Sequence, residues 1–254
     1  MLNCMFTIMR KNILIIPDVH GRTFWKAAVK SGNYKKIVFL GDYTDPYEMD
    51  GITNTDALKN FRSIIDFKRH HPEKVVLLLG NHDLHYFSQY YYELAGCGRY
   101  DPISAVVLQR LFVKYHDYFQ LAWETDWGHK HYLFSHAGIT QSWLIRNMEL
   151  IREPNARHLN RLLYFNEGLE SLAQVGEMRC GDYPSGSIVW ADVEEMLVSK
   201  PIPYIYQIVG HSMQFDGPII NDQFACLDCR AAFSLDSNGN FTPVTELKTD
   251  EEYI

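Results

Sequence analysis

Five short polar clusters along the chain carry side chains that can bind metal ions. The clusters read DVHG, GDYTD, GNHD, SHAG and GHS, and each follows a short apolar run. Their candidate ligands are Asp18, His20, Asp42, Asp45, Asn81, His82, Asp83, His136 and His211. Carboxylate, amide and imidazole ligands suit Mn, Fe, Zn or Ni, whereas a set of cysteines alone would favour zinc or iron–sulfur.

This ligand set is too large for one tetrahedral ion. Two divalent ions about 3.5 to 4 Å apart would share it, with one carboxylate as a bridge. Such a pair lowers the pKa of a bound water and holds phosphoryl oxygens. A single cluster would be interpreted as turn formers and helix caps, but five clusters in one chain favour a metal centre.

The apolar runs before these clusters predict the elements that position them. Runs that are short, rich in β-branched residues and bounded by turn residues predict strands. They lie at residues 12–17, 37–40, 75–79, 131–134 and 204–209. Helical patterns at residues 22–31 and 53–70 separate the first three runs. This alternation indicates βαβ units and a parallel sheet, whose ligands collect outside the carboxyl ends of the strands.

The remaining segments predict helices and then a β-rich end. Residues 83–120 form a tyrosine-rich helical insertion near the site, interrupted by GCGRYDP, and residues 141–175 are largely helical. Residues 218–245 predict short antiparallel strands, the last two joined by an Asn-Gly turn. The tyrosines are expected to pack within the core, with stacking on a nucleobase as the alternative. Trp143 and Trp190 are also expected in the core.

Composition bounds the class of protein. The chain has 254 residues, 46% of them hydrophobic and 22% charged, which is typical of a soluble globular protein. Without a linker, a single domain over residues 1–254 is expected. Residues 1–10 precede the first strand and are interpreted as a frayed tail or as containing an alternative start.

Charge and cysteine content exclude further classes. The formal net charge of −7 lacks the basic footprint of a duplex-binding protein. Five cysteines are too few and too scattered for a disulfide framework, so a reducing, cytoplasmic location is expected. The CxxC of Cys226 and Cys229 has no second pair and predicts buried thiols, not zinc. No apolar run is long enough for a membrane span, and no signal peptide is expected.

The five clusters, in this order and at these intervals, resemble the signatures of the calcineurin-like metallophosphoesterases. The resemblance covers roughly residues 11 to 230. SHAG and the segment SIVWAD look more like the serine/threonine protein phosphatase and bis(5'-nucleosyl)-tetraphosphatase branch than the cyclic-nucleotide branch. It implies an α/β fold with a two-sheet β-sandwich flanked by helices, layered α/β/β/α.

The resemblance also implies a role for each residue. Asp18, His20 and Asp42 match ligands of a first metal, and Asp42, Asn81, His136 and His211 match ligands of a second. His82 matches the histidine that protonates the leaving alcohol, and Asp45 matches the carboxylate that orients it. This pairing is chemically sound, because an alkoxide leaving group needs a general acid. The implied mechanism is attack on phosphorus by a metal-bound hydroxide without a covalent intermediate.

The sequence departs from the family pattern at two places. Pro46 stands where the protein phosphatases have a phosphate-binding arginine. Arg179 is the candidate for the second family arginine, and Arg22 is a candidate substitute for the first. Asp83 stands where that branch usually has glutamate, and no substrate is inferred from it.

The expected activity is hydrolysis of a phosphomonoester, on a phosphoprotein or a small phosphometabolite. One alternative is a dinucleoside polyphosphate, or another nucleotide diester or anhydride. A second is a non-catalytic binding module on the same fold. The complete ligand set and the His82–Asp45 pair favour catalysis.

Overall fold

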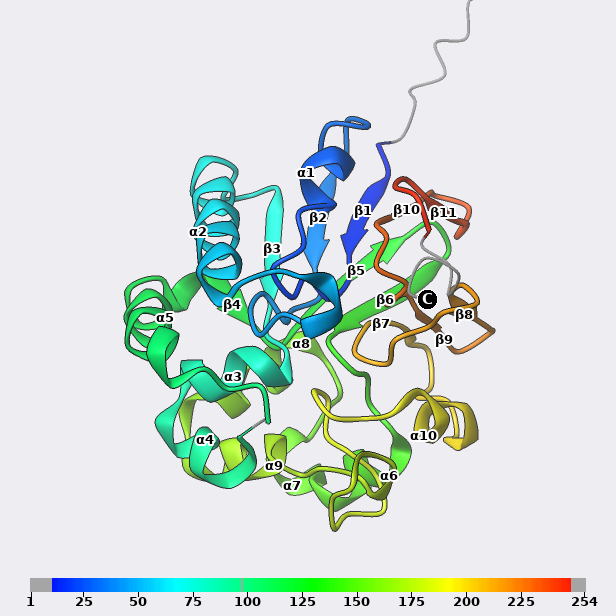
Figure 1. The fold of residues 1–254 in the computed structure, drawn as a ribbon. Coiled ribbons are helices and arrows are strands. Elements are labelled where there is room, and N and C mark those ends of the chain that lie inside the picture. Colours follow the sequence, from blue (N-terminus) through cyan, green and yellow to red (C-terminus); the bar gives the residue numbers. More distant parts are fainter. Residues whose placement is uncertain (1–10, 97, 248–254) are drawn as a thin grey trace, which may run out of the picture.

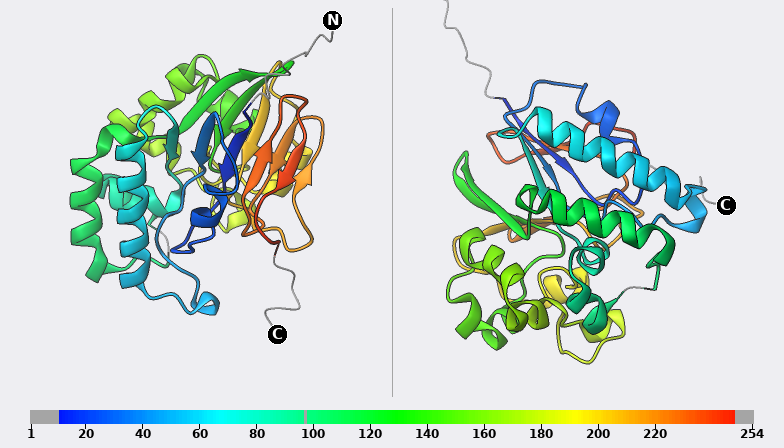
Figure 2. Two further views of the ribbon diagram at one scale, coloured as in Figure 1. Left: turned by 90° about the horizontal axis from the view of Figure 1, so that it is seen from above. Right: turned by 90° about the vertical axis from the view of Figure 1, so that its left-hand side faces the viewer.

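The computed structural model describes residues 11–96 and 98–247 (Figure 1). Two mixed sheets pack face to face, with helices on their outer sides, in a single domain (Figure 2). The predicted tail at residues 1–10 lies outside the described residues, so the predicted domain limits stay untested.

The first sheet has six strands in the order β11-β10-β1-β2-β3-β4. β1, β2, β3 and β4 run parallel, and β10 is antiparallel to β1. The bounds are β1 Ile13–Ile16, β2 Lys36–Phe39, β3 Val75–Leu78, β4 Phe119–Gln120, β10 Phe233–Leu235 and β11 Phe241–Pro243. The parallel core of the sheet therefore agrees with the βαβ prediction.

The second sheet has five strands in the order β5-β6-β7-β9-β8. The bounds are β5 Ala122–Trp127, β6 Lys130–Ser135, β7 Tyr206–Val209, β8 Ile219–Ile220 and β9 Phe224–Cys226. β6, β7 and β9 run parallel. β8 and β9 pair antiparallel, as predicted for the C-terminal end, and β9 also pairs with β7 in parallel.

Alternating side chains of the strands separate the core into layers. Ile13 and Ile15 of β1 pack between the sheets with Phe134 of β6 and Ile208 of β7. Leu14 and Ile16 face the opposite side, under the helices. Period-two alternation of apolar residues on both faces is what a sheet buried on both sides requires.

The helices lie outside the sheets. Their bounds are α1 Trp25–Ala28, α2 Asn54–His70, α3 Asn81–Phe87, α4 Gln89–Ala95, α5 Pro102–Lys114, α6 Gln141–Arg146, α7 Met148–Ile151, α8 Ala156–Arg161, α9 Asn166–Leu172 and α10 Val193–Val198. The 3₁₀ turns are η1 Glu48–Asp50, η2 His116–Tyr118, η3 Leu162–Tyr164 and η4 Glu177–Arg179. The helix predicted at 22–31 is shorter in the structure, where it is limited to α1. Arg22 lies in the loop before it, and the main-chain carbonyl of Arg22 accepts a hydrogen bond from the Asn60 side chain.

Two strands, β4 and β5, were not predicted. The β5 segment AWETDW carries two acidic residues, which disfavour strands locally. It forms a hairpin with β6, in which His131 lies 2.8 Å from Asp126 and 3.4 Å from Glu124. Cross-strand pairing of this kind is invisible to local propensity. Among the described residues, no helix is long and apolar enough to cross a membrane.

Candidate metal centre and active site

The metal-ligand candidates meet at the carboxyl ends of strands from both sheets. Asp18 and His20 follow β1, Asp42 and Asp45 follow β2, and Asn81 begins α3 after β3. His136 follows β6 and His211 follows β7, in the facing sheet. All seven residues are at least 91% buried, and the most exposed of them, His211, is 9% exposed.

The first group consists of Asp18, His20 and Asp42, whose ligand atoms lie within 4.8 Å of one another. His20 Nδ1 donates to main-chain carbonyls of Thr44 and Asp45 at 2.9 and 3.0 Å. Its Nε2 is therefore turned toward Asp42 Oδ2 at 3.4 Å and Asp18 Oδ2 at 3.9 Å. A carbonyl partner on one ring nitrogen is the usual way to orient a metal-ligating histidine.

The second group consists of Asp42, His136 and His211, with Asn81 beside it. His136 Nδ1 donates to the carbonyl of Leu40 at 2.9 Å, so a neutral ring presents Nε2 as an acceptor. That atom faces Asn81 Oδ1 and His211 Nδ1 at 3.0 Å each, and Asp42 Oδ2 at 3.5 Å. Converging acceptors of this kind suit a bound cation.

Asp42 belongs to both groups. Its Oδ2 lies 3.4 Å from His20 Nε2 and 3.5 Å from His136 Nε2. Two ligands that bind one ion at about 2.1 Å in tetrahedral geometry are about 3.4 Å apart. Its Oδ1 accepts from the main-chain N–H of His82 at 3.0 Å, which fixes the carboxylate. Asp42 is therefore placed to bridge two ions.

The electrostatics of the centre also fit metal binding. Burial lowers the pKa of His20 to about 4 and lowers the pKa values of His136 and His211, so these rings are neutral, as metal ligands must be. Burial, with Asp228 and Asp42 nearby, raises the pKa of the Asp18 carboxyl. The described side chains leave buried negative charge here that divalent cations would neutralise.

Backbone conformations are unusual at these positions. His20, Asp42, Asp45 and His211 all have positive φ, between 42° and 65°. Non-glycine residues seldom adopt this conformation, and it costs roughly 1–3 kcal/mol each when the surroundings impose it. Strain of this kind is frequent at functional sites. Here the positive-φ conformation directs the side chains of successive loops toward one point.

Two glycines allow close approach to the ligands. A Cβ atom on Gly80 would overlap Oδ1 of Asp42, and one on Gly210 would overlap Oδ1 of Asp18. The glycines of GNHD and GHS are therefore sterically required.

His82 and Asp45 form a hydrogen-bonded pair beside the centre. His82 Nδ1 lies 2.9 Å from Asp45 Oδ2. The same carboxylate contacts His85 Nε2 at 2.8 Å and accepts from the Tyr86 hydroxyl at 2.6 Å. Asp45, His82 and His85 also form a third group close enough to hold an ion. We interpret these contacts as hydrogen bonds and not as a third ion site. Through them, His85 and Tyr86 hold the Asp45 carboxylate in place.

Sequence reasoning missed Arg99, which reaches the centre from the helical insertion. Its Nη2 lies 2.9 Å from His82 Nε2, and its Nη1 donates to the carbonyl of Asp45 at 3.0 Å. The guanidinium also lies over the Tyr47 ring, 3.7 Å from its centroid. The sequence signal that could have identified Arg99 is a basic residue within the glycine-containing segment GCGRYDP, which interrupts the helical insertion near the site.

The two predicted phosphate-binding arginines differ in placement. Arg179 lines the cavity and is held by Ser212 at 2.7 Å and by Asp192 at 2.7 Å. Arg22 is turned to Asp50, with Nε and Nη2 each 2.9 Å from Oδ2, and its side chain is only 10% exposed. A phosphate contact from Arg22 would compete with this ion pair.

Asp83 is a structural carboxylate. It accepts hydrogen bonds from the main-chain N–H groups of Asp42 at 2.6 Å, Gly80 at 2.8 Å and Tyr43 at 3.0 Å. These bonds join the loops after β2 and β3. A shorter aspartate at this position is therefore explained by backbone geometry, and its side chain is absent from both metal-ligand groups that share Asp42.

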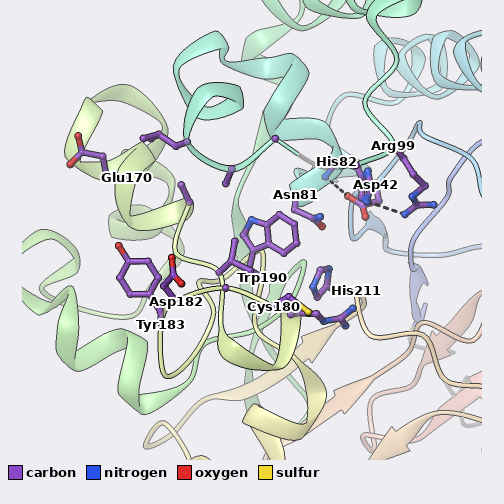
Figure 3. A pocket seen from close by; sticks show the side chains of 18 of the residues that line it. Asp42, Asn81, His82, Arg99, Glu170, Cys180, Asp182, Tyr183, Trp190 and His211 are labelled. Carbon is purple, nitrogen blue, oxygen red and sulfur yellow. Dashed lines mark hydrogen bonds between the residues drawn. The ribbon is translucent and has the colours of Figure 1, made fainter.

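A cavity of about 840 Å³ opens over the centre (Figure 3). Asp42, Asn81, His82 and His211 form its floor beside Arg99, while Glu170, Asp182 and Tyr183 lie at the other end. Trp190 lines the middle and donates to the Tyr91 hydroxyl at 2.7 Å. The expectation that Trp190 is core holds only in part, because it packs against the core from a partly buried position and also lines the cavity, whereas Trp143 is fully buried.

The insertion tyrosines pack as expected. Tyr86 and Tyr91 are at most 1% exposed, and Tyr90, Tyr100, Tyr115 and Tyr118 pack against the core from partly buried positions. The tyrosines that line the cavity within the described chain are Tyr47 and Tyr183, from other segments. Cys226 and Cys229 are buried free thiols, as predicted.

The family is established by comparison with known proteins. Residues 11–212 match the family model described as calcineurin-like phosphoesterase. The chain therefore belongs to the calcineurin-like phosphoesterase family, which confirms the predicted resemblance. It is a phosphoesterase, a hydrolase of phosphoric ester bonds, and its family uses divalent metals, for which the His/Asp groups above are candidate ligands.

Solved structures give weaker similarities. One is a protein serine/threonine phosphatase from Saccharomyces cerevisiae with similarity to human phosphatase PP5, 12% identical, with a TM-score of 0.47 over 91% of this chain and 74% of that chain. Another is a metallophosphoesterase from Sphaerobacter thermophilus, 16% identical, with a TM-score of 0.33 over 79% of this chain and 60% of that one. No curated protein matches the chain.

Proposed function

We propose that the chain is a phosphomonoesterase that uses two divalent ions. The observation that carries this proposal is the position of Asp42 Oδ2 between His20 Nε2 and His136 Nε2, at 3.4 and 3.5 Å. Asp18, His20 and Asp42 would hold one ion, and Asp42, Asn81, His136 and His211 the other. When bound, the ions would activate water and polarise the phosphoryl group.

The chain's own residues supply the remaining chemistry. His82 would protonate the leaving-group oxygen through Nε2, because Nδ1 is occupied by Asp45. Asp45 orients the ring by accepting a hydrogen bond from Nδ1. Arg179 would bind a phosphoryl oxygen, since it lines the cavity that contains His82. Arg22 is the weaker candidate for such a contact, because its side chain is only 10% exposed, against 30% for Arg179.

The substrate we propose is a phosphomonoester on a small molecule or on a protein. Nucleotide anhydrides and diesters are the second candidate, which the partly buried indole of Trp190 and the ring of Tyr183 in the cavity favour. Either ring could stack on a base. Two details extend the proposal: manganese is a suitable ion for these ligands, and the free thiols of Cys180, Cys226 and Cys229 suit a cytoplasmic location.

A metal-reconstituted activity panel tests this proposal. The protein is stripped with chelator, reloaded with Mn, Ni, Zn or Mg, and assayed on p-nitrophenyl phosphate, a phosphothreonine peptide, bis-p-nitrophenyl phosphate and a dinucleoside tetraphosphate. Metal-dependent hydrolysis that is fastest on a monoester supports the proposal. A preference for the tetraphosphate would establish the second candidate. Two bound ions per chain without turnover of any substrate would favour a non-catalytic binding module.

A further inference from the structure

Arg99 is the feature of the cavity that the ligand set does not explain. It lies between α4 and α5 of the insertion, far in sequence from the strand-end loops. Its guanidinium nevertheless contacts His82 Nε2 and the carbonyl of Asp45 at 2.9 and 3.0 Å, and it lines the cavity beside Asp42 (Figure 3). The insertion therefore reaches the reacting end of the cavity.

Among the residues that the structure describes, Arg99 forms no ion pair with a carboxylate. Arg22, Arg179 and Arg230 are each paired with an aspartate at 2.7 to 3.0 Å. Over residues 11–96 and 98–247, no such ion pair includes Arg99, whose partners are a ring nitrogen, a carbonyl and the Tyr47 ring. A partly buried guanidinium with neutral partners, in a cavity floored by candidate metal ligands, is suited to bind an anion.

We propose that Arg99 binds the phosphoryl group of the substrate, an inference that rests on the proposed function. Its Nη1 is anchored to the carbonyl of Asp45, directly before Pro46, the position that lacks an arginine in this sequence. The guanidinium of the insertion thus binds the main chain at the residue before Pro46. The tyrosine-rich insertion then contributes to the active site through Arg99.

The contact with His82 indicates how Arg99 responds to substrate. A guanidinium only donates, so His82 Nε2 is the acceptor in this structure. A phosphoryl oxygen is a stronger acceptor than an imidazole nitrogen and takes its place as the partner of Nη2. His82 Nε2 is then released, so that it can take up a proton from solvent and donate it to the leaving-group oxygen. Tyr47 keeps the guanidinium stacked in place during this exchange of partners.

Phosphate binding by variants of Arg99 tests the inference. Inorganic phosphate is titrated by calorimetry into metal-loaded wild type, Arg99→Ala and Arg99→Lys, and is assayed as a competitive inhibitor of p-nitrophenyl phosphate hydrolysis. Loss of a charge-assisted, two-pronged contact is expected to weaken phosphate binding about 10- to 100-fold in Arg99→Ala. Phosphate affinity of Arg99→Lys is expected to be intermediate, because lysine keeps the charge but cannot form the paired hydrogen bonds of a planar guanidinium. Metal content should match wild type in both.

Arg110→Ala is the matched control, since Arg110 is an exposed arginine on α5 of the same insertion. It should bind phosphate like wild type. Unchanged phosphate affinity in folded Arg99→Ala would overturn the inference, and if that variant does not fold, unchanged affinity in Arg99→Lys and Arg99→Gln would do so. If wild type hydrolyses no ester, the proposed function fails, and the calorimetric comparison still decides whether Arg99 binds phosphate.

Discussion

The carboxylate of Asp45 lies 2.9 Å from Nδ1 of His82, and both residues are at least 93% buried. Asp45 holds this position with a φ of 55° and with contacts from His85 and Tyr86. Asp45, in the loop after β2, thus fixes the ring of His82, which lies on α3 after β3. Such a pair has a chemical use, because the ring nitrogen that faces the cavity can carry a proton to a leaving group.

Replacing His82 tests that use. His82→Ala should keep wild-type metal content but lower kcat by about 10²- to 10⁴-fold on alkyl phosphates, whose leaving groups need a proton. On p-nitrophenyl phosphate the loss should be far smaller, because p-nitrophenolate leaves without protonation. Steady-state kinetics on both substrates measure the difference. Equal losses would argue against a general acid, and His70→Ala, an exposed histidine of α2, is the control.

Asp42 is the residue on which both metal groups depend. Asp42→Asn should remove metal and activity together, since its Oδ2 lies within 3.5 Å of histidine nitrogens from both groups. Metal content by elemental analysis and turnover of p-nitrophenyl phosphate check this. Two ions per chain in the variant would contradict the bridging role.

Much of this centre follows from the sequence. The strands before DVHG, GDYTD and GNHD are short buried runs between turn residues, and the parallel arrangement brings their carboxyl ends to one edge. His136 and His211 are harder to place from local pattern alone, because they come from the second sheet. Their approach to Asp42 depends on how the two sheets pack.

Arg99 and Trp190 show where local pattern is insufficient. Arg99 lies in a glycine-containing connection, and nothing in its neighbours in sequence indicates that His82 is its partner. Trp190 resembles a core residue by type, yet it lines the cavity while packing against the core. Both placements depend on long-range packing of the insertion and of the segment before α10.

Asp83 should contribute mainly to stability. Asp83→Ala leaves three buried N–H groups without their acceptor, on Asp42, Gly80 and Tyr43. Each such loss costs about 1–3 kcal/mol, so the free energy of unfolding should fall by roughly 2–5 kcal/mol after partial relaxation. Urea denaturation of the metal-stripped protein measures this. A change below about 0.5 kcal/mol would contradict the role, and the exposed Asp117→Ala should have little effect.

The free energy of unfolding of the metal-stripped protein should fall as the pH drops below about 6.5. Burial lowers the pKa of His20 in the folded state to about 4, below its ordinary value of 6.5, so the unfolded chain binds more protons between these values. Stability therefore falls as pH drops from about 6.5 toward 4, by roughly 3 kcal/mol for this residue. Urea denaturation at pH 7 and pH 5 measures the slope. His20→Gln should flatten it, and an unchanged slope would contradict the buried neutral state.

Metal ions should stabilise the folded chain strongly. Buried acceptors and carboxylates face one another in the centre, and ions that bind only the folded state add about 2.7 to 4.1 kcal/mol per site at 100 to 1,000 times their Kd. For a chain of this size this raises Tm by about 5 to 15 °C relative to the chelator-treated protein. Differential scanning fluorimetry with and without added Mn measures the shift. Asp42→Asn serves as the control, because its shift should be small. A wild-type Tm that does not respond to any divalent metal would contradict the assignment of these residues as ligands.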